Sequence, residues 1–161
     1  MGIIFENLNE LYDELGDFLN NQKSEGKKII AHFGHEFVPH ELIEAAGAVP
    51  LNLMFAGNED LMQIGADFLN PTMCSYARSI IGMFDKKEED RSYEFLKYID
   101  GIIISNYCTA NLLVSESISK NFKVKGIEFF VPYMQKTKHK IYYQEQLDSG
   151  ETCTKVNDND L

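Results

Sequence analysis

The stretches Lys28-Ile-Ile-Ala-His-Phe33 and Asp100-Gly-Ile-Ile-Ile-Ser105 decide the fold of this chain. Each is a short apolar run at a turn, which is typical of a strand buried on both faces. Two further runs of this kind lie at residues 49–55 and 127–132. We therefore expect strands near 28–33, 49–54, 101–105 and 127–131.

Helical patterns fill the chain between these runs. We expect helices over residues 41–47, 59–67, 73–84, 93–98, 109–121 and 135–147. Strands that alternate with helices predict βαβ units, so the fold class is α/β with helices on both faces of the sheet. The sequence predicts a doubly wound, mostly parallel four-stranded sheet of the Rossmann or flavodoxin type, in the order 2-1-3-4.

A separate amphipathic helix is predicted at the N-terminus, over residues 5–20. Apolar residues recur there at steps of three and four with acidic residues between them, and the Asn20-Asn21 pair and the Ser24-Glu25-Gly26 stretch are expected to break the helix. We expect the helix to pack on the sheet or on a partner through Phe5, Leu8, Leu11, Leu15 and Phe18. The chain then divides into an N-terminal helix (1–25), an α/β domain (26–147) and a polar tail (148–161) that is expected to be disordered.

The overall charge restricts the class of partner. The 161 residues carry a formal net charge of −10, and the acidic excess lies at the two ends of the chain. Without a basic face, binding to nucleic acid is disfavoured. No apolar run reaches the roughly 18 residues of a membrane span, and no basic segment precedes an apolar leader. The sequence predicts a soluble, cytoplasmic protein without nucleic-acid or membrane partners.

Common cofactor and metal motifs do not match. No GxGxxG or Walker A motif follows a strand, and the three cysteines form no CxxC pair. His35-Glu36 and His40 differ from HExxH because the second histidine comes one residue late and Pro39 interrupts the helix. A metal site of His32, His35 and His40 remains an alternative, although polar residues at a strand end and a helix start are the favoured interpretation.

Cys74 and Cys108 are informative by their position. Cys74 opens a predicted helix, and Cys108 follows the third predicted strand. In an open α/β sheet, ligands bind beyond the carboxyl ends of the strands, and a helix N-terminus stabilises a thiolate. The sequence alone leaves two interpretations open, namely two ligands in one crevice or two buried cysteines that pack as small apolar residues.

An ordered set of motifs over about residues 26–147 resembles a known family, the iron–sulfur subunits of 2-hydroxyacyl-CoA dehydratases and benzoyl-CoA reductases. The opening matches in Gly26-Lys-Lys-Ile-Ile-Ala-His-Phe33 and in Phe37-Val-Pro-His-Glu-Leu-Ile-Glu-Ala-Ala-Gly-Ala-Val-Pro-Leu51. Three further motifs follow in the family's order. They are Cys74 with Arg78, the strand that leads to Cys108, and Val131-Pro132 before Tyr142-Tyr-Gln-Glu-Gln-Leu147.

The resemblance implies a cofactor and a reaction. Family subunits have two α/β domains, and three cysteines hold a [4Fe–4S] cluster with one open iron position; Cys74 and Cys108 match the first two. An ATP-hydrolysing activator protein injects an electron for radical dehydration or reduction of an acyl-CoA. Arg78, His35 and Thr109 would then line the cluster or the substrate, and Thr109 stands where an acidic residue is frequent.

The same resemblance leaves the site incomplete. The third ligand lies in the family's second domain, where this chain stops, and Cys153 sits in the tail without a family motif. We expect a truncated or split chain completed by a second domain or subunit, or a relative that has lost the site. The alternative function is a non-enzymatic α/β binding or assembly module without a cluster. A flavin-binding role has less support, because no Ser/Thr/Gly-rich loop follows the first strand.

Overall fold

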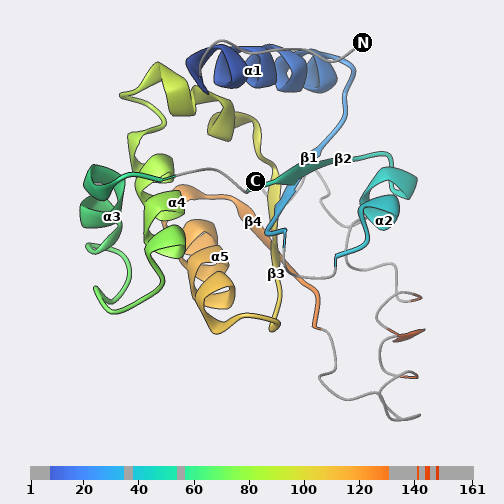
Figure 1. Ribbon diagram of the computed structural model, residues 1–161. Helices are drawn as coiled ribbons and strands as arrows, with labels where there is room; N and C mark the ends of the chain where they lie inside the picture. The colour runs from blue at the N-terminus through green and yellow to red at the C-terminus, as the bar shows by residue number, and fades with distance from the viewer. Residues whose placement is uncertain are drawn as a thin grey trace.

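Four short strands form one parallel sheet in the computed structural model, which describes residues 8–34, 38–53 and 57–130 together with 141, 144, 145 and 148 (Figure 1). The strands are β1 (Ile29–His32), β2 (Val49–Asn52), β3 (Gly101–Ile104) and β4 (Lys125–Glu128). Their order is β2-β1-β3-β4, and each neighbouring pair is parallel. The predicted topology is confirmed, and the carboxyl ends of these strands meet at one edge of the sheet.

Helices cover both faces of this sheet. The connections contain α2 (His40–Ala45), α3 (Glu59–Gly65), α4 (Ser75–Lys86), the 3-10 helix η1 (Arg91–Tyr98) and α5 (Thr109–Phe122). In Figure 1, α3, α4 and α5 lie on one side of the strands and α2 lies on the other. This arrangement is the predicted doubly wound one, in which each crossover returns to the amino edge of the sheet.

Alternating strand residues build a core on each face. Ile29 and Ala31 of β1 pack with residues of α4 and α5, whereas Ile30 packs with Ile43 of α2. Because successive side chains of a strand point to opposite faces, the apolar run of β1 serves both cores. The larger core lies under α4 and α5, and the α2 side holds the smaller one.

The fourth strand differs from its prediction. It spans Lys125–Glu128 instead of 127–131, because the register with β3 decides where the strand begins. Lys125 stands opposite Gly101, and the Lys125 N–H donates to the Asp100 carbonyl at 3.2 Å. Phe129 follows the strand and is buried, which explains why the apolar run extends beyond it.

The N-terminal helix is longer than predicted. Helix α1 spans Leu8–Ser24, so the expected break at Asn20-Asn21 is wrong, whereas the helix does end at the Ser24-Glu25-Gly26 stretch. The Lys23 Nζ in this extra turn donates to the Asp100 carboxylate at 2.6 Å, and Leu19 in the turn before it is buried. Tertiary contacts therefore outweigh the low helix propensity of asparagine.

The buried face of α1 also differs from the predicted one. Tyr12 and Leu19 are buried, whereas Phe18 is 48% exposed. The helix packs mainly on η1, where the Tyr12 ring stacks on Phe95 with 5.6 Å between centroids. Figure 1 shows α1 lying across the amino end of the sheet, above η1.

Several predictions from the sequence concern residues outside the described ranges. These are Phe5, most of the helix at 135–147 and nearly all of the tail at 148–161. Within the described part of the chain, no helix is long and apolar enough to cross a membrane.

Candidate functional site

The carboxyl edge of the sheet is where the βα connections place their polar residues. Helix α4 begins at this edge, because the Tyr76 hydroxyl in its first turn donates to the Leu53 carbonyl just after β2. The Tyr76 ring also meets Phe33, just after β1, edge-on with 6.0 Å between centroids. Helix α5 begins at the same edge, five residues after the end of β3.

Cys74 and Cys108 occupy equivalent positions in these two connections. Each is the N-cap residue of its helix, α4 for Cys74 and α5 for Cys108, and neither side chain caps the helix. Their carbonyls accept the first helical hydrogen bonds, from Arg78 at 3.1 Å and from Leu112 at 2.9 Å. Both thiols are free; Cys74 is exposed and Cys108 is half-buried.

The two cysteines lie on the same side of the sheet. Helices α4 and α5 pack against each other, and near their C-termini Phe84 and Phe122 have ring centroids 5.7 Å apart. Lys87 Nζ lies 5.1 Å from the centroid of the Phe122 ring, at the same end of the pair. The helices therefore run in the same direction, with both N-termini at the carboxyl edge.

The remaining predicted site residues are placed differently. Thr109 is the first residue of α5 and is exposed next to Cys108. Arg78 lies against α3, where its Nη1 is 3.4 Å from the Met62 carbonyl, and it makes no ion pair with a described carboxylate. Its Nε is buried without a hydrogen-bond partner in the described structure. His35 lies outside the described residues.

The two thiols at this edge do not by themselves make up a metal site. Among the residues that the structure describes, no three or more His, Cys, Asp or Glu side chains gather as a metal site. Cysteine thiolates are the donors that iron–sulfur clusters use, so Cys74 and Cys108 have the right chemistry. Two thiols fit such a cluster only as part of a larger ligand set.

A groove lies beside Cys74. It has a volume of about 340 Å³, between the α3–α4 connection and the outer surface of α5. Its lining residues are Phe68, Leu69, Asn70, Met73, Leu113, Glu116, Ser117, Lys120 and Asn121. Met73 directly precedes Cys74, whereas Lys120 and Asn121 lie in the last turns of α5, so the groove extends along α5 away from the carboxyl edge.

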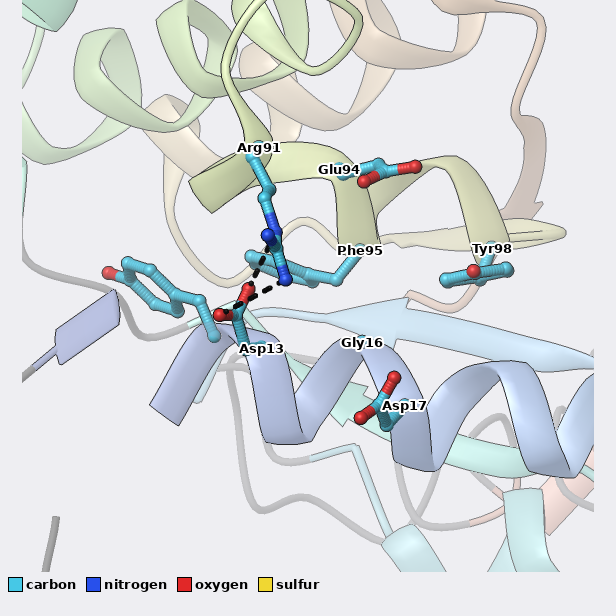
Figure 2. Close-up of a pocket in the computed structure, with 8 residues that line it drawn as sticks. Asp13, Gly16, Asp17, Arg91, Glu94, Phe95 and Tyr98 are labelled. Carbon is cyan, nitrogen blue, oxygen red and sulfur yellow. Dashed lines mark hydrogen bonds and ion pairs between the residues drawn. The ribbon is translucent and has the colours of Figure 1, made fainter. Parts of the chain in front are cut away.

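A second hollow lies between α1 and η1, away from the cysteines (Figure 2). Its volume is about 100 Å³, and Arg91 Nε is 3.3 Å from the Asp13 carboxylate within it. Figure 2 shows Arg91 extending from η1 to Asp13 on α1. The hollow lies within the packing contact between α1 and η1, at the amino end of the sheet. It is therefore part of the contact that holds α1.

The carboxyl edge carries a different group on the α2 side. His32 at the end of β1 is 1% exposed, and its ring lies 4.5 Å from that of His40. Burial lowers the pKa of His32 below its usual 6.5; the contact with the Phe33 carbonyl opposes this shift, and the nearby His40 adds to it. Asn52 stands opposite His32 in β2. The pairing of His32 with Asn52 depends on the strand register, so it was not predicted from the sequence.

Comparison with known proteins gives one family match. The family model described as 2-hydroxyglutaryl-CoA dehydratase, D-component, matches residues 36–155, which is well over half of the chain. The matched range contains Cys74 and Cys108 and the elements from α2 to β4. No curated protein matches the chain.

Proposed function

Because the chain belongs to the 2-hydroxyglutaryl-CoA dehydratase D-component family, we propose that it contributes part of a [4Fe–4S] cluster and acyl-CoA site. Cys74 and Cys108 are its iron ligands. The site serves radical dehydration of a 2-hydroxyacyl-CoA or reduction of an acyl-CoA. A second domain or subunit completes the ligand set, and an ATP-dependent activator protein supplies the electron.

The position of the two cysteines is the observation that supports this proposal. Each thiol stands at the N-terminus of a helix, and both helices begin at the carboxyl edge on the same side of the sheet. Helix N-termini carry partial positive charge, which favours the thiolate over the thiol. Ligands of open α/β sheets bind at this edge.

The chain's own residues have three tasks in this proposal. Cys74 and Cys108 hold thiolates toward the edge, and Tyr76 fixes the first turn of α4 against the end of β2. When bound, the cluster supplies a low-potential electron and an open iron position. Met73, which directly precedes the exposed Cys74, contributes an apolar wall to the groove along α5.

Completion by another domain or subunit follows from the donor count. Two thiols leave a cubane cluster without its other protein ligand, so the isolated chain is expected to bind iron weakly. Cys153 is not assigned a role. Arg78, which the sequence analysis placed near the cluster, lies against α3 and is proposed to position the start of α4.

Anaerobic reconstitution with iron and sulfide tests the proposal. We expect a broad visible absorbance that is labile in the isolated chain and stable when the completing subunit is co-produced. The variants C74S and C108S should lose most of the bound iron, and C153S serves as the matched control. Iron content that is equal in all variants, or colourless protein even with the completing subunit, would favour the alternative of a module without a cluster.

A further inference from the structure

Two polar side chains lie on the α2 side of the sheet, on neighbouring strands at the carboxyl ends of β1 and β2. His32 and Asn52 are register partners in these parallel strands, so their side chains point to the same face. That face is the one of Ile30, which precedes His32 by two residues and packs with Ile43 of α2. The pair therefore lies on the face opposite to α4 and α5, which carry the cysteines.

The hydrogen bonding of His32 leaves one ring nitrogen free to act as a ligand. Nδ1 lies 3.3 Å from the Phe33 carbonyl oxygen, which can only accept, so Nδ1 is assigned the proton. Nε2 then presents its lone pair, and it is buried without a hydrogen-bond partner among the described residues. Metal-bound histidines have this arrangement, with the second ring nitrogen donating to a backbone carbonyl.

The side chain of Asn52 also contains a buried acceptor without a partner among the described residues. This acceptor is its Oδ1 atom. A buried amide oxygen and a buried imidazole lone pair both need a hydrogen-bond donor or a cation, and leaving them unpaired is costly. One cation between the two strands would satisfy both atoms.

His40 supplies a third donor. It is the first residue of α2 and is exposed, and its ring centroid lies 4.5 Å from that of His32 with the planes at 53°. With metal–nitrogen bonds of about 2.0–2.1 Å, two imidazoles on one ion have centroids about 4.5 Å apart at a right-angled N–metal–N and about 5.2 Å apart at a tetrahedral one. The observed separation falls in this range.

We propose that His32, His40 and Asn52 bind a divalent transition-metal ion of the zinc class. Imidazole nitrogens suit zinc, nickel, copper and cobalt, whereas magnesium and calcium prefer sets of carboxylate oxygens. The site uses an amide oxygen and two imidazoles with no thiol. It is therefore separate from the proposed cluster ligands and does not depend on them.

Cobalt binding tests this site without interference from the thiols. The full chain with Cys74→Ser, Cys108→Ser and Cys153→Ser is titrated with Co²⁺ and followed by its visible ligand-field absorbance. We expect one equivalent of Co²⁺, displaced by Zn²⁺. His40→Ala should weaken binding by roughly tenfold or more, whereas Asn52→Asp should strengthen it by adding a negative ligand. Asn121→Asp, at an exposed amide of α5 on the opposite face of the sheet, is the control and should leave binding unchanged.

Nitrogen NMR of the histidine rings identifies the ligands directly. On adding Zn²⁺, the Nε2 signal of His32 and one nitrogen of His40 should move to metal-bound positions. Unchanged Co²⁺ affinity in His40→Ala, or unshifted His32 signals at saturating Zn²⁺ in a folded protein, would overturn the proposal and leave a water molecule as the occupant. Far-UV circular dichroism confirms that each variant is folded.

Discussion

The Asp100 carboxylate joins three parts of the chain at the amino edge of the sheet. It accepts the Ile29 N–H at 2.8 Å and the Lys23 ammonium at 2.6 Å, and Lys28 Nζ lies 3.9 Å away. The Asp100 side chain is only 10% exposed, so these interactions are partly shielded from water. Asp100 thereby connects α1 with β1 and β3.

Removing this carboxylate should destabilise the protein. We expect Asp100→Ala to lower the free energy of unfolding by about 1–3 kcal/mol, because the Ile29 N–H loses its side-chain acceptor. Urea denaturation measures the change. Asp13→Ala is the control, since Asp13 pairs with Arg91 at an exposed position and should cost at most about 1 kcal/mol. Equal losses in the two variants would contradict the role of Asp100.

Gly65 and Gly16 form a second contrast between single residues. A Cβ built on Gly65 would lie 2.0 Å from the Arg78 backbone carbonyl, whereas on Gly16 it would lie 3.8 Å from Phe95. Gly65→Ala should therefore force α3 and α4 apart and cost about 1–3 kcal/mol. Gly16→Ala should raise stability by about 0.5–1 kcal/mol, because alanine is the better helix former. Thermal unfolding of both variants checks the opposite signs, and a stabilised Gly65→Ala would contradict the close α3–α4 contact.

Helix α1 shows that sequence periodicity can predict a helix without predicting which face of it is buried. Steps of three and four predicted a helix correctly but placed Phe18 on its packing face. The partner of the helix sets that face: η1 meets Tyr12, and Leu19 reaches the larger core, while Phe18 lies to one side. The position of η1 depends on long-range packing, which the local pattern does not contain.

Neighbouring residues of α1 test this assignment. Leu19→Ala should cost about 2–5 kcal/mol, because a side chain that is 1% exposed leaves a cavity. Phe18→Ala should change stability by no more than about 0.5 kcal/mol, as an exposed position does. Chemical denaturation measures both. If Phe18→Ala proved the more damaging, the packing face of α1 would be the one that the sequence predicted.

Strand positions were easier to predict than strand ends. Four apolar runs gave the number and order of the strands, since parallel βαβ units have few possible topologies. The start of β4 was missed, because Lys125 and Gly126 are not apolar and enter the sheet only through pairing with β3. Register is a property of two strands together and cannot be predicted from either strand alone. The pairing of His32 with Asn52 was not predictable for this reason.

At the scale of the molecule, the two faces of the sheet carry different polar side chains at the carboxyl edge. The α4 and α5 side carries the two cysteines at helix N-termini, and the α2 side carries His32, His40 and Asn52. The sequence predicted the location of the cysteines because ligand sites follow the carboxyl ends of parallel strands. The direction of Arg78 was not predictable, because it depends on how α3 packs against α4.

Mössbauer spectroscopy of the anaerobically reconstituted protein tests most directly whether Cys74 and Cys108 share one cluster. With the completing subunit present, the account predicts the spectrum of a four-iron cubane in the unsubstituted chain and in C153S. The same spectrum should be lost in C74S and in C108S, because each removes a ligand from one cluster. A cubane spectrum that persists unchanged in C74S or in C108S would contradict the account.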